Sequence, residues 1–208
     1  KRGKMPPNIK FGTDGWRGVI GEDFTFDNVR ACAQGVADYL LDNGIARKGL
    51  MIGYDTRFAS EDFAAAVAEV IAGNGIKAYL NPRPAPTPVI SYAIVAKKAA
   101  GAVIITASHN PAVWNGFKYK PEYAGSASPE VTADLEKRIH QNVNSGKVKR
   151  VALPDGLKQG LIEYHDPEPV YLSHIGKLVD LQPIRRSGLN IAIDSMYGSG
   201  SVYCRKLH

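Results

Sequence analysis

The chain has 208 residues, 44% of them hydrophobic, and a formal net charge of +6, so it can bury a core larger than that of one average domain. Its basic residues gather at the termini and in polar segments, and no nucleic-acid-binding module occurs, which argues against a nucleic-acid partner. No stretch approaches 18 consecutive apolar residues and no apolar leader begins the sequence, so we expect a cytoplasmic protein with no membrane partner.

The first third of the sequence predicts helices that alternate with short strands. Residues 25–43 show apolar residues recurring on one helical face, and Thr25 can cap the first turn. The apolar run at 50–54 predicts a buried strand, and residues 60 to about 73 predict a second helix with two carboxylates in its first turn. Residues 76–80 are expected to form the next short strand.

The same alternation continues through the middle of the chain. The segment 81–88 holds four prolines and is expected to be a loop, after which residues 87–98 predict a helix with proline in its first turn. The continuous apolar run at 102–106 predicts a strand, 117–120 a short return strand, and 128–144 a further helix. This order predicts an α/β fold, a three-layer α/β/α domain around a mixed but mostly parallel sheet.

The last quarter of the chain changes in character. We expect residues 1–150 to form the α/β/α domain and the polar segment 151–168 to be a linker. Residues 169–208 are expected to begin a second α/β domain, with a helix at 170–178 and a strand at 189–194. One helix and one strand cannot cover both faces of a sheet, so the remainder of that domain is expected in C-terminal domains missing from this chain.

A loop of small and polar residues, 106–111, follows one of the predicted apolar strands. In an open α/β sheet, the usual ligand site lies outside the carboxyl ends of the strands. Ser108 is followed by His109, and Lys118 lies on the expected return strand. The G-x-S-x-G pattern of serine hydrolases is absent around Ser108, which favours phosphoryl transfer over hydrolysis. From the residues alone, a simple turn with no chemistry is an equal alternative.

A second loop, FGTDGWRG at 11–18, has a similar composition. Glycines let backbone amides approach an anion closely, and Arg17 can hold a phosphate through two hydrogen bonds. Thr13, Asp14 and Gly15 are expected to support such a site. Taken alone this pattern is weak, because glycine-rich turns with a surface arginine are common.

Four segments together resemble the α-D-phosphohexomutase superfamily, which includes phosphoglucomutases and phosphomannomutases. In chain order they are FGTDGWRG at 11–18, GYDTR at 53–57 with Ser60, TASHNP at 106–111 followed by NGFK at 115–118, and DSMYGSG at 194–200. The agreement in order over nearly the whole chain argues against a chance match to any single motif.

The resemblance implies a phosphohexose mutase that moves a phosphoryl group between O1 and O6 of a hexose phosphate. Phosphorylated Ser108 is expected to donate its group to the sugar and to recover the other group from the resulting bisphosphate. Glucose 1,6-bisphosphate or a related bisphosphate is the expected activator. Mg²⁺ is the expected cofactor, bound in part through the phosphate on Ser108.

The resemblance also distributes roles among the other site residues. Arg17 is expected to hold the phosphoryl group, and His109 and Lys118 are alternative candidates for general acid and base, or for hydrogen bonding and electrostatic support alone. Arg57 is expected to brace the loop rather than to touch substrate, and Asn110 to support it.

Three motifs of the family do not occur here: the aspartate-rich DGDxDR metal loop, the sugar-recognition loop and the distal phosphate-binding loop. We therefore expect an N-terminal part of a mutase that is inactive by itself. The alternative hypothesis is a non-catalytic phosphosugar-binding or regulatory module that keeps the loop without the chemistry.

Overall fold

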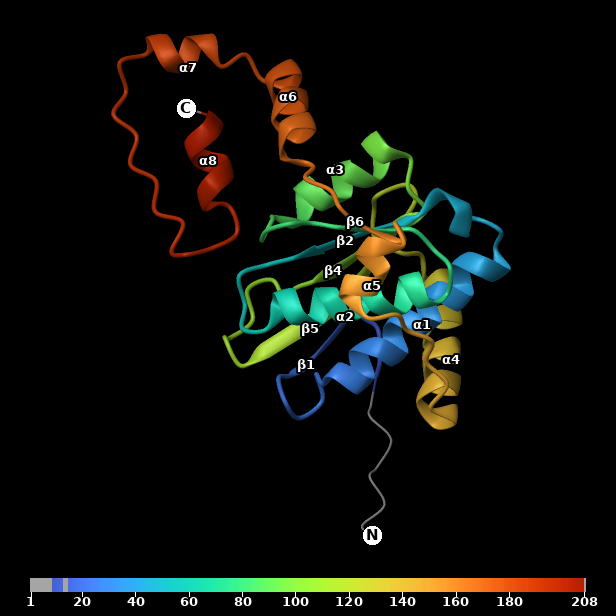
Figure 1. Ribbon diagram of the computed structural model, residues 1–208. Helices are drawn as coiled ribbons and strands as arrows, with labels where there is room; N and C mark the ends of the chain where they lie inside the picture. The colour runs from blue at the N-terminus through green and yellow to red at the C-terminus, as the bar shows by residue number, and fades with distance from the viewer. Residues whose placement is uncertain (1–8, 13–14, 208) are drawn as a thin grey trace.

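One mixed sheet organises the part of the chain that the computed structural model describes, residues 9–12 and 15–207 (Figure 1). The strands are β1 (Trp16–Val19), β2 (Leu50–Tyr54), β3 (Ala78–Leu80), β4 (Gly101–Ile105), β5 (Trp114–Pro121) and β6 (Ile162–Tyr164), in the order β1-β5-β4-β2-β3-β6. Strands β4, β2, β3 and β6 pair in parallel, whereas β5 is antiparallel to both β4 and β1. The predicted mixed, mostly parallel sheet is therefore confirmed.

Helices cover both faces of this sheet, which confirms the three-layer prediction (Figure 1). Helices α1 and α2 lie on one face with α4 and α5 outside them, while α3 lies on the other face and contacts α6. The bounds are α1 (Phe26–Asp42), α2 (Ser60–Gly73), α3 (Thr87–Lys97), α4 (Pro129–Ser145), α5 (Leu153–Lys158), α6 (Glu168–Leu178), α7 (Gln182–Arg186) and α8 (Ser201–Leu207), with a 3₁₀ turn η1 (Ala46–Lys48).

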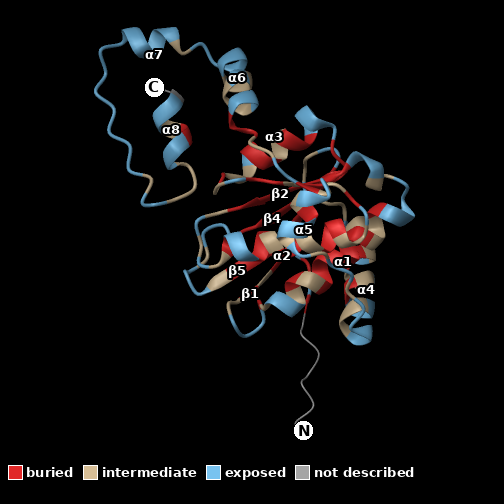
Figure 2. Cartoon of the chain, in the orientation of Figure 1, coloured by how far each residue is buried: buried red, intermediate tan, exposed pale blue. Residues whose placement is uncertain are grey.

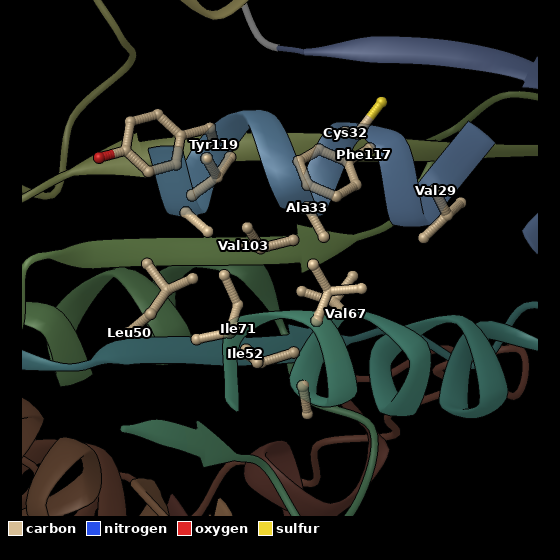
Figure 3. Close-up of a cluster of buried hydrophobic side chains, with 14 of the residues drawn as sticks. Val29, Cys32, Ala33, Leu50, Ile52, Val67, Ile71, Val103, Phe117 and Tyr119 are labelled. Atoms are coloured by element: carbon tan, nitrogen blue, oxygen red, sulfur yellow. The ribbon is translucent and has the colours of Figure 1, made fainter. Parts of the chain in front are cut away.

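The core divides into two clusters, one on each face of the sheet (Figure 2). Figure 3 shows the larger cluster, in which Val67 and Ile71 of α2 lie against Ile52 and Val103 of the strands. Cys32 of α1 is completely buried there, and burial raises the pKa of its thiol far above the usual range. It thus serves as a small apolar residue of the core.

Helix starts follow local chemistry only in part. Thr25 caps α1 as predicted, because its hydroxyl accepts a hydrogen bond from the Asn28 N–H. Ser60 is instead the first residue of α2 and Ala59, in a left-handed conformation with φ 57°, precedes it. Since the Ser60 hydroxyl is buried and bonds another side chain, it does not serve as a cap.

The expectation of a linker at 151–168 is wrong for most of its length. The segment forms α5 and then β6, which adds a sixth strand beside β3. Val151, Leu153 and Leu157 pack against the larger core cluster, and the Val151 N–H donates to the Glu69 carbonyl at 3.0 Å. These few apolar residues among many polar ones suffice because an edge strand needs only one partner and one buried face.

The C-terminal segment also differs from the prediction. Residues 189–194 form no strand, and their apolar side chains Leu189, Ile191 and Ile193 are 71%, 51% and 48% exposed. A strand requires a neighbour to complete its backbone hydrogen bonds, and none lies beside this run among the described residues. The chain loops outward there before returning through α8, as Figure 1 shows. Within the described ranges no helix has the length and apolar content needed to cross a membrane.

Candidate functional site

The serine loop lies at the carboxyl edge of the parallel strands. It leaves β4 after Ile105, beside the end of β2, where the Asp55 N–H donates to the Ile105 carbonyl at 3.1 Å. It returns into β5 at Trp114. This is the edge at which ligands bind in open α/β sheets, so the position predicted from the sequence is correct.

Ser108 adopts a left-handed backbone conformation, with φ 57°, and its side chain is exposed. For a residue other than glycine that conformation costs about 1–2 kcal/mol. Its N–H donates to the Thr106 hydroxyl at 3.0 Å, and the Asn110 N–H donates to the Ala107 carbonyl at 3.1 Å. An exposed hydroxyl on a turn that is strained and yet fixed is typical of a functional position.

His109 lies beside the serine hydroxyl. Its Nδ1 is 3.3 Å from Ser108 Oγ, and both side chains are exposed. The imidazole can accept the serine proton or donate to the hydroxyl oxygen, depending on which ring nitrogen carries hydrogen. The geometry therefore allows either of the two roles expected for His109.

Arg17 reaches the serine loop from β1, the strand at the edge of the sheet. Its Nη1 donates to Asn110 Oδ1 at 2.5 Å, which joins two of the predicted site residues directly. Gly15, just before β1, has φ 106°, and a Cβ added there would lie 2.4 Å from the Phe117 carbonyl oxygen. Glycine is thus required for the close approach of this turn to β5. Thr13 and Asp14 lie outside the described residues.

Lys118 comes from β5, the return strand. It pairs with Ile104 in β4, while Gly116 pairs with Arg17 in β1. Alternate residues of a strand share a face, so Lys118 and Arg17 lie on the same face of the sheet. The lysine is 6% exposed, which places a cation in a largely desolvated position near the serine loop.

Arg57 holds the serine loop through its backbone. Its Nη2 donates to the Ser108 and Asn110 carbonyls at 2.8 and 2.7 Å, and its Nη1 to the Pro111 and Trp114 carbonyls at 2.9 and 3.0 Å. All four hydrogens of the two terminal nitrogens are consumed by the loop. Arg57 is therefore in position to brace the loop, and those hydrogens are not available to a substrate.

Two buried polar residues beneath the loop, Asn115 and Ser60, belong to the segments that resemble the family, but neither is among the predicted site residues. They lie in different elements and meet only in the folded structure. The available signal was a polar side chain at the first buried position of a strand, which needs a partner wherever it is enclosed.

The described residues do not provide a metal site. No group of three or more His, Cys, Asp or Glu side chains that could hold a metal ion occurs in residues 9–12 and 15–207. Asp55, the carboxylate next to the loop, faces the Arg57 guanidinium, with 3.3 Å between Oδ2 and Nε. The site is thus rich in cations and suited to a phosphoryl group, but it does not supply the carboxylate ligands that Mg²⁺ prefers.

Comparisons with known proteins agree with this geometry. Residues 8–145 match the family model described as phosphoglucomutase/phosphomannomutase, alpha/beta/alpha domain I. The phosphoglucomutase of Komagataeibacter xylinus is 34% identical over 206 residues, which cover 94% of this chain and 37% of that protein. The phosphoglucosamine mutase of Mycobacterium leprae (strain Br4923) is 35% identical over 193 residues, 92% of this chain and 39% of that protein.

A solved structure shows the same arrangement. The crystal structure of a Thermus thermophilus protein, described as a "putative phosphomannomutase", superposes with a TM-score of 0.82 at 32% identity. The match covers 98% of this chain and 43% of that one. The present chain therefore spans about two fifths of the length of these relatives.

Proposed function

Since this chain belongs to the phosphoglucomutase/phosphomannomutase family, we propose that Ser108 is the phosphoserine of a phosphohexose mutase, which moves a phosphoryl group between O1 and O6 of a hexose phosphate. The observation that carries the proposal is the geometry of Ser108. Its hydroxyl is exposed at the carboxyl edge of β4, in a loop held by Arg57 and contacted by Arg17 through Asn110. Phosphoryl transfer depends mainly on such positioning and on positive charge.

The proposed chemistry consists of two transfers. In the first, the bond between phosphorus and Ser108 Oγ breaks while a sugar oxygen bonds to phosphorus; the sugar hydroxyl loses its proton to a base, and the released Ser108 Oγ takes up a proton. In the second, Ser108 Oγ gives up that proton and bonds to the other phosphoryl group of the bisphosphate, and the sugar oxygen that is released regains a proton. His109 and Lys118 are the candidate proton carriers, and Arg17 and Lys118 stabilise negative charge on the moving group.

Mg²⁺ is the cofactor proposed for the complete enzyme, where it would offset negative charge on the phosphoryl group. The phosphate on Ser108 would supply one oxygen ligand, and the carboxylate ligands would come from C-terminal domains of a longer chain. Those domains would also supply the contacts that select the hexose phosphate. Because the described residues lack a metal cluster, we expect little mutase turnover from the 208-residue chain alone in a coupled assay with glucose 1-phosphate.

The alternative is a non-catalytic phosphosugar-binding module, because the same exposed loop and its arginine could bind a phosphosugar without transferring a phosphoryl group. Intact-mass measurement of the complete gene product, incubated with Mg²⁺ and glucose 1,6-bisphosphate, separates the two. A mutase should gain about 80 Da, the mass of one phosphate group, and Ser108→Ala should not. Ser126→Ala, which removes another exposed hydroxyl outside the site, is the control and should gain the same mass. A wild-type protein that stays unmodified, or a gain that survives in Ser108→Ala, would refute the proposal.

A further inference from the structure

A chain of buried hydrogen bonds runs beneath the serine loop, and the proposed chemistry gives it no role. It begins in β5, where Asn115 Nδ2 donates to Ser60 Oγ at 2.9 Å and Asn115 Oδ1 accepts from the Gly116 N–H at 2.8 Å. Asn115 is completely buried and Ser60 is 1% exposed. Burying a polar side chain without a hydrogen-bond partner destabilises the fold, so the Asn115–Ser60 pair is held in a single arrangement.

The chain continues from Ser60 to Asp55. Ser60 Oγ donates to Asp55 Oδ1 at 2.9 Å, and the same oxygen accepts from the Arg57 backbone N–H at 3.0 Å. With Oδ1 held by two donors, the other oxygen, Oδ2, faces Arg57 Nε at 3.3 Å. The direction of the carboxylate, and with it the direction of the guanidinium, is thus set from the core side.

The two ends of this hydrogen-bond network, Asn115 and Arg57, lie at the two ends of the serine loop. Asn115 follows Trp114, the residue at which the loop enters β5, and Arg57 binds the carbonyl of Ser108 near the loop's start. Packing alone does not require this arrangement, because an apolar pair of similar volume would fill the same space without needing partners. Ser108 does require it, since a residue in the left-handed region stays there only when its surroundings fix it.

We propose that Asn115 and Ser60 are positioning residues, which act through Asp55 and Arg57 to hold Ser108 in the orientation required for phosphoryl transfer. The inference rests on the proposed function of Ser108. It assigns Asn115, the second residue of β5, and Ser60, the first residue of α2, to one task, although they are far apart in sequence. A loop that loses this support places its hydroxyl less often in line with the phosphoryl group.

The test compares Ser60→Ala with the wild type in the complete gene product. The time course of mass gain at several concentrations of glucose 1,6-bisphosphate gives both the maximal rate of Ser108 phosphorylation and the half-saturating concentration. We expect Ser60→Ala to lower the maximal rate about ten- to a hundredfold and to leave the half-saturating concentration nearly unchanged. Hydrogen exchange of the amides of residues 107–114 should become faster in the same variant.

Asn74→Ala is the control, because it breaks another side-chain hydrogen-bonded pair, in which Gln34 is buried and Asn74 half-buried, away from the site. Asn74 Nδ2 donates to Gln34 Oε1 at 2.9 Å, and Gln34 Nε2 donates back to Asn74 Oδ1 at 2.9 Å. The control should be destabilised in urea as Ser60→Ala is, yet keep its phosphorylation rate and its exchange in residues 107–114. If both variants lose the rate to the same extent, the Ser60 pair has only a structural role and the inference is wrong.

Asp55→Asn provides a second variant should Ser60→Ala not fold, since it keeps the volume but removes the charge and one of the two acceptor oxygens that face Ser60 and Arg57. It should also slow phosphorylation and accelerate exchange in residues 107–114, and wild-type behaviour in both would overturn the inference. Exchange is measured without any phosphoryl donor. A wild type that is never phosphorylated therefore refutes the proposed function, whereas unchanged exchange in a phosphorylatable protein refutes the positioning role.

Discussion

Two irregular and exposed segments of this protein differ in how they are hydrogen-bonded to the rest of the fold. The serine loop, residues 106–113, is polar, yet Arg57 and Arg17 reach it from other elements and bind four of its backbone or side-chain oxygens. Residues 187–200 contain an apolar run, yet the hydrogen bonds described for them reach at most four positions along the chain. The serine loop is therefore fixed by hydrogen-bond donors from other elements, whereas the apolar residues of 187–200 do not by themselves tie that segment to the rest of the fold.

The largest expected effect comes from removing the side chain of Arg57, which supplies most of the hydrogen bonds to the serine loop. Arg57→Ala should reduce Ser108 phosphorylation by about a hundredfold or more, because three loop carbonyls and that of Trp114 lose their donors together. Intact-mass time courses measure it. Arg185→Ala, an exposed arginine of the C-terminal segment, should behave as wild type. Arg57→Lys should fail nearly as badly, since an ammonium cannot form the planar fork, and full activity in that variant would contradict the bracing role.

A smaller effect is expected from two glycines with positive φ: Gly15, in the turn that lies against β5, and Gly188, in the segment 187–200. Gly15→Ala should lower the free energy of unfolding by about 2–4 kcal/mol, because the new methyl group meets the Phe117 carbonyl as well as the unfavourable φ. Gly188 has φ 68° but nothing within 4 Å of an added Cβ. Gly188→Ala should therefore lower the free energy of unfolding only by the conformational cost of about 1 kcal/mol. Urea unfolding of both variants measures the difference, and equal losses would mean that β1 does not lie as close to β5 as described.

The smallest effect concerns β6, the strand built from the predicted linker. Lys77 lies 2.8 Å from Glu163, and the hydrogen bond from Lys77 lowers the pKa of this carboxyl group. A carboxyl group whose pKa is lowered by folding stabilises the fold above its unfolded-state pKa and loses that contribution as the pH falls through its folded-state pKa. Lys77→Met should thus cost no more than about 0.5 kcal/mol at neutral pH, and less in acid, since both side chains are partly exposed.

Urea unfolding as a function of pH tests this ion pair. Asp180→Asn, in the C-terminal segment, is the control for removing one charge elsewhere. A Lys77→Met loss that grows as the pH falls would mean that the ion pair does not stabilise β6.

The sequence predicts most of the fold where periodicity is strong. The continuous apolar runs at 50–54 and 102–106 correspond to β2 and β4, and the one-sided apolar pattern of 25–43 corresponds to α1. β1 and β6 were missed because each is an edge strand of three or four residues whose polar positions resemble a loop. The prediction of a strand at 189–194 is wrong for a different reason. An apolar pattern indicates that a segment could form a strand, but it does not show whether a neighbouring strand is present to pair with it.

The sequence predicts only those parts of the site that are adjacent along the chain or that belong to the family's motifs. Ser108, His109 and Asn110 are adjacent in sequence, and the family's motifs supply Arg17, Arg57 and Lys118. The contact between Ser60 and Asn115 could not be inferred, since 55 positions separate these residues and one lies in α2 and the other in β5, so they meet only in the folded structure. The linker prediction failed because the Lys and Gly residues between a few apolar ones do not reveal that Leu153, Leu157 and Ile162 pack against the core.

The antiparallel pairing of β1 with β5 sets the order in which this site can arise on the ribosome. Trp16 pairs with Phe117, so the strand that carries Arg17 is synthesised about a hundred residues before its partner. At ordinary translation rates that interval is roughly 5–20 s. During it, β1 has no strand to complete its hydrogen bonds, and closing so long a loop is a slow, non-local step. The arginine and the serine therefore meet late in folding, after β2, α2 and β4 can already have formed the centre of the sheet.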